Sequence, residues 1–269
     1  MHEKRTFSPF HFDQRGCVMK KLMAANWKMY KTGAEAVATV KEMAEMLKGP
    51  APEGRESVIF VPFTALEKAS ESMEAIKGGM TGAENVYPAA EGAFTGEISP
   101  AMIKACGASW VLTGHSERRH IIGESDSFVG DKTAFALANG LRVMLCIGET
   151  LEERESGLLR NVLERQLKLG LKNVPAETPS DALAIAYEPV WAIGTGKTAT
   201  TEDIVETHAI CRELMREILG EKADETPLLY GGSVKPANAG SILALDNVDG
   251  VLVGGASLKA DSFTQIINA

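Results

Sequence analysis

Residues 183–188 read Leu-Ala-Ile-Ala-Tyr-Glu, an unbroken apolar run that ends at a carboxylate. A short run that is apolar at every position is typical of a strand buried on both faces, because a half-exposed strand would alternate apolar and polar residues. Similar runs recur along the chain, and polar residues or glycines follow most of them. The eight runs are residues 22–27, 58–62, 80–83, 110–113, 143–147, 183–187, 228–230 and 250–253.

Helical patterns separate these runs. Residues 34–47 place apolar side chains three or four positions apart, which puts them on one face of a helix. Residues 151–171 form a longer charged amphipathic stretch, and residues 201–219 repeat the pattern. Strands that alternate with helices predict an α/β protein with a parallel sheet. Eight such units without a linker between halves favour a single closed (β/α)8 barrel over a doubly wound sheet.

Composition and charge limit the possible functions. The chain has 269 residues, 45% of them hydrophobic, which is enough for a large core and suits one barrel. The formal net charge of −8 argues against a nucleic-acid-binding protein, which usually has a basic surface. Residues 1–21 carry +3 and the remainder −11. We expect residues 1–20 to be an extension, either disordered or upstream of a true start at Met19, and residues 21–269 to form the barrel domain.

Targeting and cysteine patterns indicate a cytoplasmic protein. The basic N-terminus lacks the apolar core of a secretory signal, and no stretch approaches the about 18 apolar residues of a membrane-spanning helix. Cys17, Cys106, Cys146 and Cys211 lie far apart and form no C-x-x-C pair. We therefore expect reduced, mostly buried thiols, without a zinc site or a disulfide framework.

His115 is a candidate acid–base residue at the predicted rim, where the polar residues after the strands meet and where barrels carry active sites. Ser116 is predicted to be the N-cap of the helix that follows. The positive end of that helix would favour a neutral imidazole, which can donate a hydrogen bond to a carbonyl oxygen. A structural histidine is the alternative. His115-Ser116-Glu117 lacks the downstream cysteine pair of zinc deaminases, so no metal site is predicted.

Glu188 reaches the same rim from the run 183–187. It could act as a general base, or it could cap a helix or join an ion pair. The residues that follow are first stiff and then small and flexible, which suits a hinged lid that keeps water out of a site. The predicted lid consists of Pro189, Val190, Trp191, Ala192, Ile193, Gly194, Thr195, Gly196, Lys197, Thr198 and Ala199.

Asn26 and Lys28 close the first run, and on a continuous strand their side chains would point to the same side. Lys28 could pair with an anion, form a Schiff base or make an ordinary ion pair. The turns Gly231-Gly232-Ser233 and Gly254-Gly255 follow the last two runs. Glycines let backbone N–H groups approach a ligand closely, and barrels often bind phosphate at this place.

Taken together, these segments resemble the triosephosphate isomerase family from about Lys21 to the C-terminus. The most specific stretch is residues 186–197, Ala-Tyr-Glu-Pro-Val-Trp-Ala-Ile-Gly-Thr-Gly-Lys. The supporting motifs occur in order along the predicted rim. They are Asn-Trp-Lys-Met at 26–29, Gly-Ala-Phe-Thr-Gly-Glu at 92–97, Gly-His-Ser-Glu-Arg-Arg at 114–119, Tyr-Gly-Gly-Ser-Val at 230–234 and Val-Gly-Gly-Ala-Ser at 253–257.

The resemblance implies a TIM barrel that interconverts dihydroxyacetone phosphate and D-glyceraldehyde 3-phosphate through an enediolate, in glycolysis and gluconeogenesis, without a cofactor or metal. Glu188 would move the proton between neighbouring carbons and His115 would polarise the carbonyl. Lys28 and Asn26 would bind substrate and stabilise negative charge, with Glu117 supporting the site beside His115. The implied phosphate-binding backbone groups are those of Gly194, Ser233, Gly254 and Gly255.

The family is usually a homodimer, so the resemblance also implies a second copy of this chain as partner. Thr95 would then approach the Asn26 and Lys28 region of that copy. Two other functions remain open from the residues. One is a Schiff-base sugar-phosphate aldolase that uses Lys28 or Lys197. The other is a catalytically silent sugar-phosphate-binding protein, which would lack the base, the histidine or the lid. None of these functions involves nucleic acid or a membrane.

Overall fold

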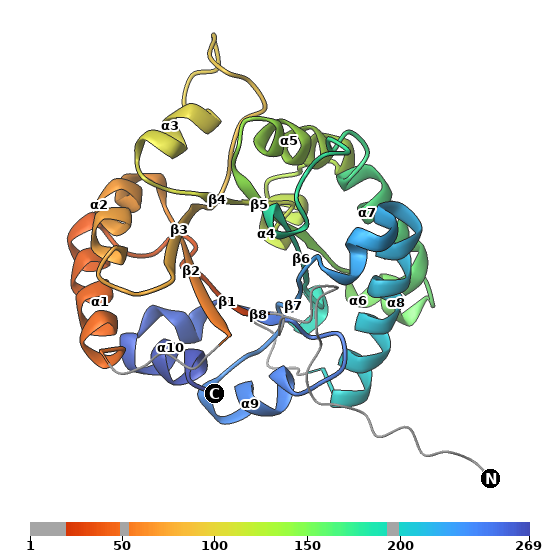
Figure 1. Cartoon of the computed structure of the whole chain (residues 1–269). Helices are drawn as coiled ribbons and strands as arrows, with labels where there is room; N and C mark the ends of the chain where they lie inside the picture. The colour runs from red at the N-terminus through yellow and green to blue at the C-terminus, as the bar shows by residue number, and fades with distance from the viewer. Residues whose placement is uncertain (1–19, 49–53, 193–198) are drawn as a thin grey trace.

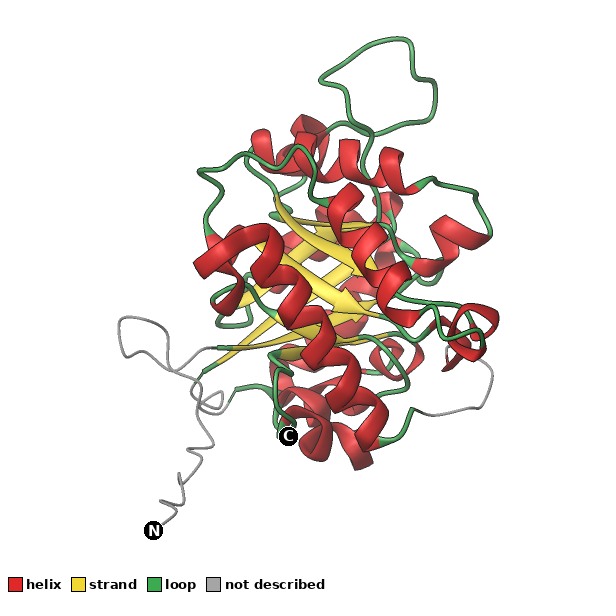
Figure 2. Ribbon diagram, turned by 90° about the vertical axis from the view of Figure 1, so that its right-hand side faces the viewer, coloured by secondary structure: helices red, strands yellow, loops and turns green. Residues whose placement is uncertain are grey.

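In the computed structural model of this chain, eight parallel strands close into a barrel in sequence order, and β8 pairs with β1. The structure describes residues 20–48, 54–192 and 199–269. Helices surround the strands (Figures 1 and 2). The predicted (β/α)8 barrel is therefore confirmed. The strands are β1 (Lys21–Asn26), β2 (Arg55–Val61), β3 (Gly79–Ala83), β4 (Trp110–Thr113), β5 (Arg142–Ile147), β6 (Leu183–Tyr187), β7 (Leu228–Tyr230) and β8 (Gly250–Val253).

Each predicted apolar run coincides with one strand, although some strands begin earlier than the run. β1, β2 and β5 start at the basic residues Lys21, Arg55 and Arg142, which are half-buried. A ladder hydrogen bond uses only the backbone, so a strand can extend past the last apolar side chain. The apolar runs therefore mark the part of each strand whose side chains are buried.

The helices agree with the predicted patterns, with one correction. The stretch 151–171 is not a single helix but two, α6 (Leu151–Glu155) and α7 (Leu159–Gly170). Gly157 lies between them with φ of +70°, a left-handed backbone that an α-helix cannot contain. The other helices are α1 (Gly33–Met46), α2 (Phe63–Met73), α3 (Pro100–Ala105), α4 (Ser116–His120), α5 (Asp126–Ala138), α8 (Thr201–Leu219), α9 (Pro236–Leu243) and α10 (Ala260–Ile267).

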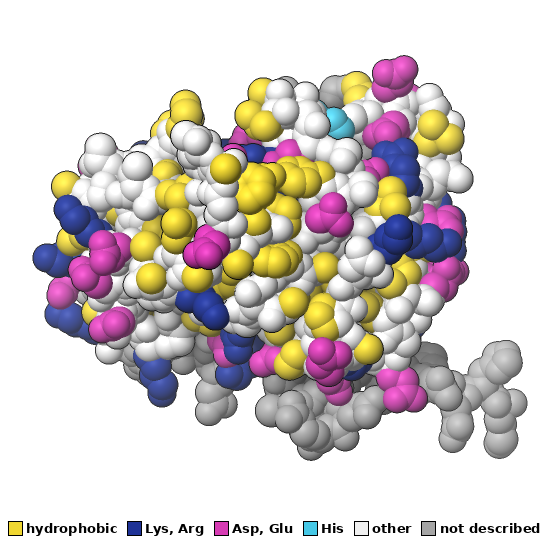
Figure 3. All heavy atoms as spheres, turned by 90° about the horizontal axis from the view of Figure 1, so that it is seen from above, with side chains coloured by type: hydrophobic (Ala, Val, Ile, Leu, Met, Phe, Trp, Pro, Cys, Tyr) yellow, Lys and Arg dark blue, Asp and Glu magenta, His cyan; other side chains and the backbone are white. Residues whose placement is uncertain are grey.

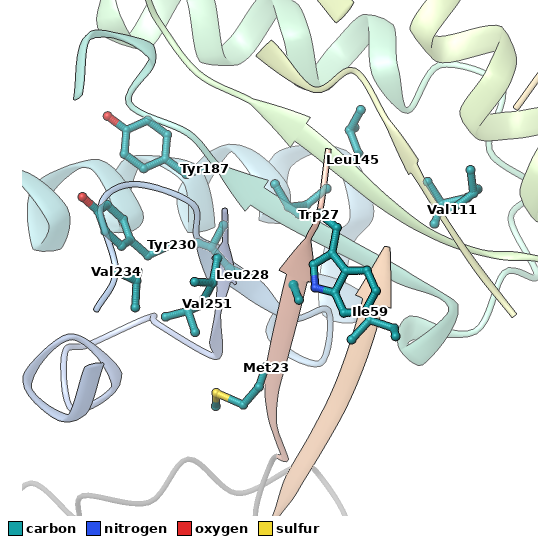
Figure 4. Close-up of a cluster of buried hydrophobic side chains, with 14 of the residues drawn as sticks. Met23, Trp27, Ile59, Val111, Leu145, Tyr187, Leu228, Tyr230, Val234 and Val251 are labelled. Atoms are coloured by element: carbon teal, nitrogen blue, oxygen red, sulfur yellow. The ribbon is translucent and has the colours of Figure 1, made fainter. Parts of the chain in front are cut away.

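The core has two layers because successive strand side chains point to opposite faces. In β6, Ala184 and Ala186 point into the barrel, whereas Leu183, Ile185 and Tyr187 point outward against the helices. Small residues inside and larger ones outside fit the narrow interior of an eight-stranded barrel. Figure 4 shows part of the outer layer, including Tyr187. The continuous apolar pattern thus reflects burial on both faces.

Two further sequence predictions concern cysteines and membrane spans. Cys146 and Cys211 are buried free thiols and Cys106 is a half-buried one, whereas Cys17 lies outside the described residues. Met19 and residues 1–18 also lie outside them. No helix in the described part of the chain combines the length and the apolar character needed to cross a bilayer.

Candidate active site

A cavity of about 300 Å³ opens at the carboxyl ends of the strands. Because all strands are parallel, the segments that follow them meet at this one rim. The cavity combines predicted site residues from the ends of β1, β4, β6, β7 and β8. Its walls are formed by Asn26, Lys28, His115, Glu188, Ala192, Gly231, Gly232, Ser233, Val234, Lys235, Leu252, Gly254, Gly255 and Ala256.

Glu188 and His115 form a buried pair in this cavity. Nε2 of His115 lies 3.0 Å from Oε1 of Glu188, and the two residues are 5% and 3% exposed respectively. The other carboxylate oxygen, Oε2, accepts a hydrogen bond from the backbone N–H of Ser116 at 3.0 Å. β6 and the start of α4 therefore bring a candidate base and a candidate proton donor together.

Hydrogen bonding keeps Glu188 ionised. Burial alone would raise the pKa of its carboxyl group, but His115, the Ser116 N–H and the charge of Lys28 together lower that pKa below its ordinary value. A carboxylate that is both buried and ionised is poorly solvated by water. Such a group can accept a proton from a ligand that enters the cavity.

His115 itself caps α4, so the prediction that Ser116 is the N-cap is wrong. Nδ1 of His115 accepts the backbone N–H of Glu117 at 3.3 Å. Ser116 is already helical, and Glu188 binds its N–H. A ring nitrogen that accepts a hydrogen bond carries no proton, so the neutral imidazole holds its proton on Nε2. That N–H points at Glu188 and into the site.

Lys28 reaches the cavity by a different route from the one predicted. β1 ends at Asn26, and Lys28 has φ of +54°, so the strand alternation does not extend to it. Oδ1 of Asn26 instead accepts the backbone N–H of Lys28 at 3.0 Å. Nζ of Lys28 lies 2.7 Å from Oε1 of Glu117. Asn26 thus holds the backbone of Lys28, and Glu117 holds its ammonium group, where this side chain lines the cavity.

Glu84, directly after β3, is a half-buried carboxyl group that sequence reasoning missed. Its burial raises its pKa to about 8, and the charge of Glu117 acts in the same direction against opposing contributions from Lys28. Oε1 of Glu84 has no hydrogen-bond partner among the described residues. No motif marks this position, because its environment depends on three segments that meet only in the fold.

Glu149, after β5, is a second functional residue that the sequence did not reveal. It is fully buried, and its Oε1 accepts hydrogen bonds from the Tyr187 hydroxyl at 3.0 Å, Trp191 Nε1 at 2.8 Å and Arg154 Nη1 at 3.1 Å. The Arg154 guanidinium lies 5.1 Å from the Trp191 ring centroid and pairs with Asp203 on α8 at 2.6 Å. Glu149 and Arg154 thus hold the first part of the predicted lid against the barrel.

The described part of that lid comprises Pro189, Val190, Trp191, Ala192 and Ala199. A short 3₁₀ helix, Val190–Ala192, follows Glu188, and Ala192 lines the cavity. The remaining lid residues lie outside the described part of the chain, including the predicted phosphate-binding Gly194 and the alternative Schiff-base residue Lys197. They are Ile193, Gly194, Thr195, Gly196, Lys197 and Thr198.

The glycine turns after β7 and β8 form one wall of the cavity and contribute Ser233, Gly254 and Gly255. No hydrogen bond between described residues uses the backbone N–H groups of Gly232 or Ser233. A Cβ at Gly232 would lie 2.1 Å from the Tyr230 hydroxyl, so only glycine fits there. These turns leave backbone donors free to bind an anion. Lys235 adds a basic residue to the same wall that the sequence analysis did not select.

Thr95 lies away from the cavity. It is exposed, in the segment between β3 and α3 that projects from the barrel in Figures 1 and 2. Thr95 is not among the described residues that line the cavity together with Asn26 and Lys28. Among the described residues, no three His, Cys, Asp or Glu side chains converge closely enough to hold a metal ion.

The fold and the cavity define a (β/α)8-barrel protein with an ionised carboxylate, a proton-donating imidazole, a lysine and free backbone donors on one rim. Within that class, the chain belongs to the triosephosphate isomerase family, whose sequence profile matches residues 21–269.

Individual relatives agree with this assignment over nearly the whole chain. Proteins named triosephosphate isomerase from Oleidesulfovibrio alaskensis and Nitratidesulfovibrio vulgaris are each 60% identical over 251 residues, which span 93% of this chain and all of each relative. The crystal structure of triosephosphate isomerase from Bartonella henselae matches with a TM-score of 0.82 at 39% identity. That match covers 92% of this chain and 98% of the other.

Proposed function

We propose that this chain is an aldose–ketose isomerase that interconverts dihydroxyacetone phosphate and D-glyceraldehyde 3-phosphate, a step of glycolysis and gluconeogenesis. The contact between Glu188 and His115 carries this proposal, because it joins an ionised base to a neutral N–H donor in a buried cavity. Isomerisation needs both groups, one for the carbon-bound proton and one for the carbonyl oxygen.

Glu188 acts as the base. Its carboxylate removes a proton from the carbon next to the carbonyl, the C–H electron pair forms a carbon–carbon double bond, and the carbonyl oxygen becomes an enediolate oxygen. Glu188 then returns the proton to the neighbouring carbon. Before this step, one carboxylate oxygen exchanges the Ser116 N–H for the substrate, which leaves an unsolvated and more basic group.

His115 and Lys28 stabilise the charge that develops on oxygen. The Nε2–H of His115 donates a hydrogen bond to the carbonyl oxygen and moves protons between the two enediolate oxygens. The ammonium group of Lys28 supplies positive charge, and Asn26 supports it from the end of β1. Glu117 keeps Lys28 in place through their ion pair. Proton transfer and charge stabilisation of this kind require no cofactor or metal.

The glycine turns bind the phosphate group. Ser233, Gly254 and Gly255 line the same cavity as Glu188, so their backbone donors can reach a bound ligand, and Gly194 would add a donor from the lid. The lid excludes water and holds the phosphate in position, because an unprotected enediolate can eliminate its neighbouring phosphate. Backbone donors and Lys28 set the local field, so a net charge of −8 does not prevent binding of a dianion.

We further propose that the chain is a cytoplasmic homodimer. Large hydrophobic side chains are exposed on the segments around the rim, among them Met29 at 96% and Ile121 at 77%. Figure 3 shows hydrophobic side chains gathered on the face seen from the side of the projecting segment. Thr95, an exposed residue of that segment, would contact the Asn26 and Lys28 region of the second copy. Residues 1–20 remain, in this proposal, an extension that the barrel does not need.

The two alternative functions gain no support from the cavity. In its ion pair with Glu117, Lys28 is an ammonium group without the lone pair that attacks a carbonyl, so a Schiff base at Lys28 is not favoured. A silent binding protein would not need an ionised base paired with a proton donor.

A coupled assay tests the proposal. The purified chain is mixed with glyceraldehyde 3-phosphate, and formation of dihydroxyacetone phosphate is followed through a reductase that oxidises NADH. We expect saturable turnover that survives a metal chelator, and no covalent adduct after borohydride treatment with substrate. An inactive, correctly folded chain, or a borohydride-trapped lysine, would contradict the assignment.

A further inference from the structure

A second groove, here called the lower groove, lies at the end of the barrel opposite the active site. It has a volume of about 300 Å³ and lies beside the ends of α2 and α3 and the beginning of β3. The strands are parallel and β3 begins at Gly79, so this groove is on the amino-terminal side of the sheet. Nothing in the isomerase reaction uses it.

Three carboxylates line one side of the lower groove. Glu67, Glu71 and Glu74 follow each other at helical spacing along α2 and its C-cap, and all three are exposed. Within the described residues, none of them forms an ion pair or a hydrogen bond. α2 has no basic residue in its last turn to offset the negative end of its dipole. Three carboxylates and no Lys or Arg therefore line the groove.

Thr81 supplies an independent observation on the floor of the groove. Its neighbours Met80 and Gly82 face the barrel interior, so Thr81 points outward between the helices. The residue is only 4% exposed, and its Oγ1 has no hydrogen-bond partner among the described residues. A buried hydroxyl without a partner is unfavourable, so a ligand in the groove that donates a hydrogen bond to it would remove this cost.

The residues that line the groove determine which class of ligand can bind there. No three His, Cys, Asp or Glu side chains of the described residues converge closely enough for a metal ion, which leaves an organic cation. Glu67 and Glu74 are separated by seven residues, or about 10 Å along a helix. Met73 and Ala105 provide apolar surface beside the carboxylates and Thr81. An extended ligand with a positive charge at each end and an apolar centre matches this arrangement.

The thiol of Cys106 is compatible with an organic cation in the lower groove. Partial burial and the charge of Glu67 raise the pKa of its thiol, so the thiol is neutral at physiological pH. The groove therefore offers carboxylates for charged groups, one hydroxyl acceptor and otherwise neutral surface.

We propose that the lower groove binds a linear alkyldiammonium ion. One ammonium group donates a hydrogen bond to Oγ1 of Thr81 and pairs with a neighbouring carboxylate, the methylene chain packs against Met73 and Ala105, and the second ammonium pairs with a further carboxylate of α2.

Titration with 1,4-diaminobutane tests this proposal on the full chain carrying ¹³C-labelled methionine methyl groups. We expect a saturable shift of the Met73 methyl signal, with no shift for Met215 on α8, which lies outside the groove. At matched ionic strength, 1-aminobutane should bind more weakly and 1,4-butanediol should cause no shift. Equal, non-saturable shifts with sodium chloride would overturn the proposal.

Two variants separate the hydroxyl from the carboxylates. Thr81→Val keeps the shape of the side chain and should weaken binding about tenfold, because it removes a hydrogen bond to a charged group. Glu71→Gln should weaken binding about threefold, and Glu42→Gln, an exposed change on α1, should leave it unchanged. Unchanged binding in both groove variants would overturn the proposal. Isomerase turnover should be the same with and without the diamine.

Discussion

At the scale of single residues, two buried carboxyl groups have opposite charge states for a physical reason. Glu188 accepts hydrogen bonds from His115 and Ser116, which lower its pKa despite complete burial. Glu84 lies close by, but one of its oxygens has no partner and burial raises its pKa to about 8. Hydrogen-bond donors and nearby positive charge thus lower the pKa of Glu188, whereas burial raises that of Glu84.

The raised pKa of Glu84 predicts how stability depends on pH. Between its ordinary pKa of 4.5 and its pKa of about 8 in the fold, the folded chain keeps a proton on Glu84 that the unfolded chain has lost. The free energy of unfolding should therefore fall as pH rises through this window and stop falling above it. Glu84→Gln should remove this slope and stabilise the protein by about a few kcal/mol at the alkaline end.

Urea unfolding at about pH 6 and about pH 8.5 measures this difference. Glu42→Gln, an exposed change on α1, serves as the control and should keep the slope of the original chain. A Glu84→Gln variant with the same pH dependence as that control would contradict the pKa assignment.

At the scale of elements, close approach between strand ends fixes the position of the base. Gly148 follows β5, and a Cβ at this position would lie 1.7 Å from the backbone carbonyl oxygen of Glu188. Gly148→Ala should therefore push β6 away, destabilise the fold by about 1 to 3 kcal/mol and reduce turnover. Gly240→Ala is the matched control, because nothing lies within 4 Å of its Cβ position in α9 and alanine favours a helix. Equal midpoint temperatures of thermal unfolding for the two variants would refute this explanation.

The link between Glu149 and Trp191 predicts a separate effect on the lid. Trp191→Phe removes the 2.8 Å hydrogen bond to Glu149 but keeps an aromatic ring under Arg154. We expect turnover to fall about tenfold and more inorganic phosphate to be released per turnover. Tyr187→Phe removes another hydrogen bond to Glu149 without changing the lid, and should leave the ratio of products unchanged. Equal release of phosphate by the two variants would contradict this explanation.

The sequence predicted the strands well because most are buried on both faces, so burial determined their composition directly. The sequence did not predict features that depend on backbone conformation or on contacts between distant segments. Gly157 divides the stretch 151–171 because of its left-handed φ, and Lys28 leaves the strand direction for the same reason. Glu84 and Glu149 acquire their properties from segments that meet only after the barrel closes. Glu188 and His115 were found because each directly follows a strand or its turn.

At the scale of the whole molecule, the exposed hydrophobic residues predict self-association. We expect light scattering at micromolar concentration to give twice the mass of one chain. Thr95→Arg should shift the protein towards the monomer and lower turnover, because a second positive charge would be placed near Lys28 of the other copy. Ala75→Arg, an exposed change beyond α2, should leave the mass unchanged. A monomeric original chain with full activity would contradict this prediction.

The central claim is that Glu188 is the base of an isomerase, and the turnover number of Glu188→Gln tests it most directly. Glutamine keeps the size of the side chain and removes the proton acceptor, so the coupled assay with glyceraldehyde 3-phosphate should show a loss of about a thousandfold or more. Circular dichroism should show an unchanged fold, and Glu202→Gln at the exposed start of α8 should retain full turnover. Near-normal turnover in Glu188→Gln would contradict the account.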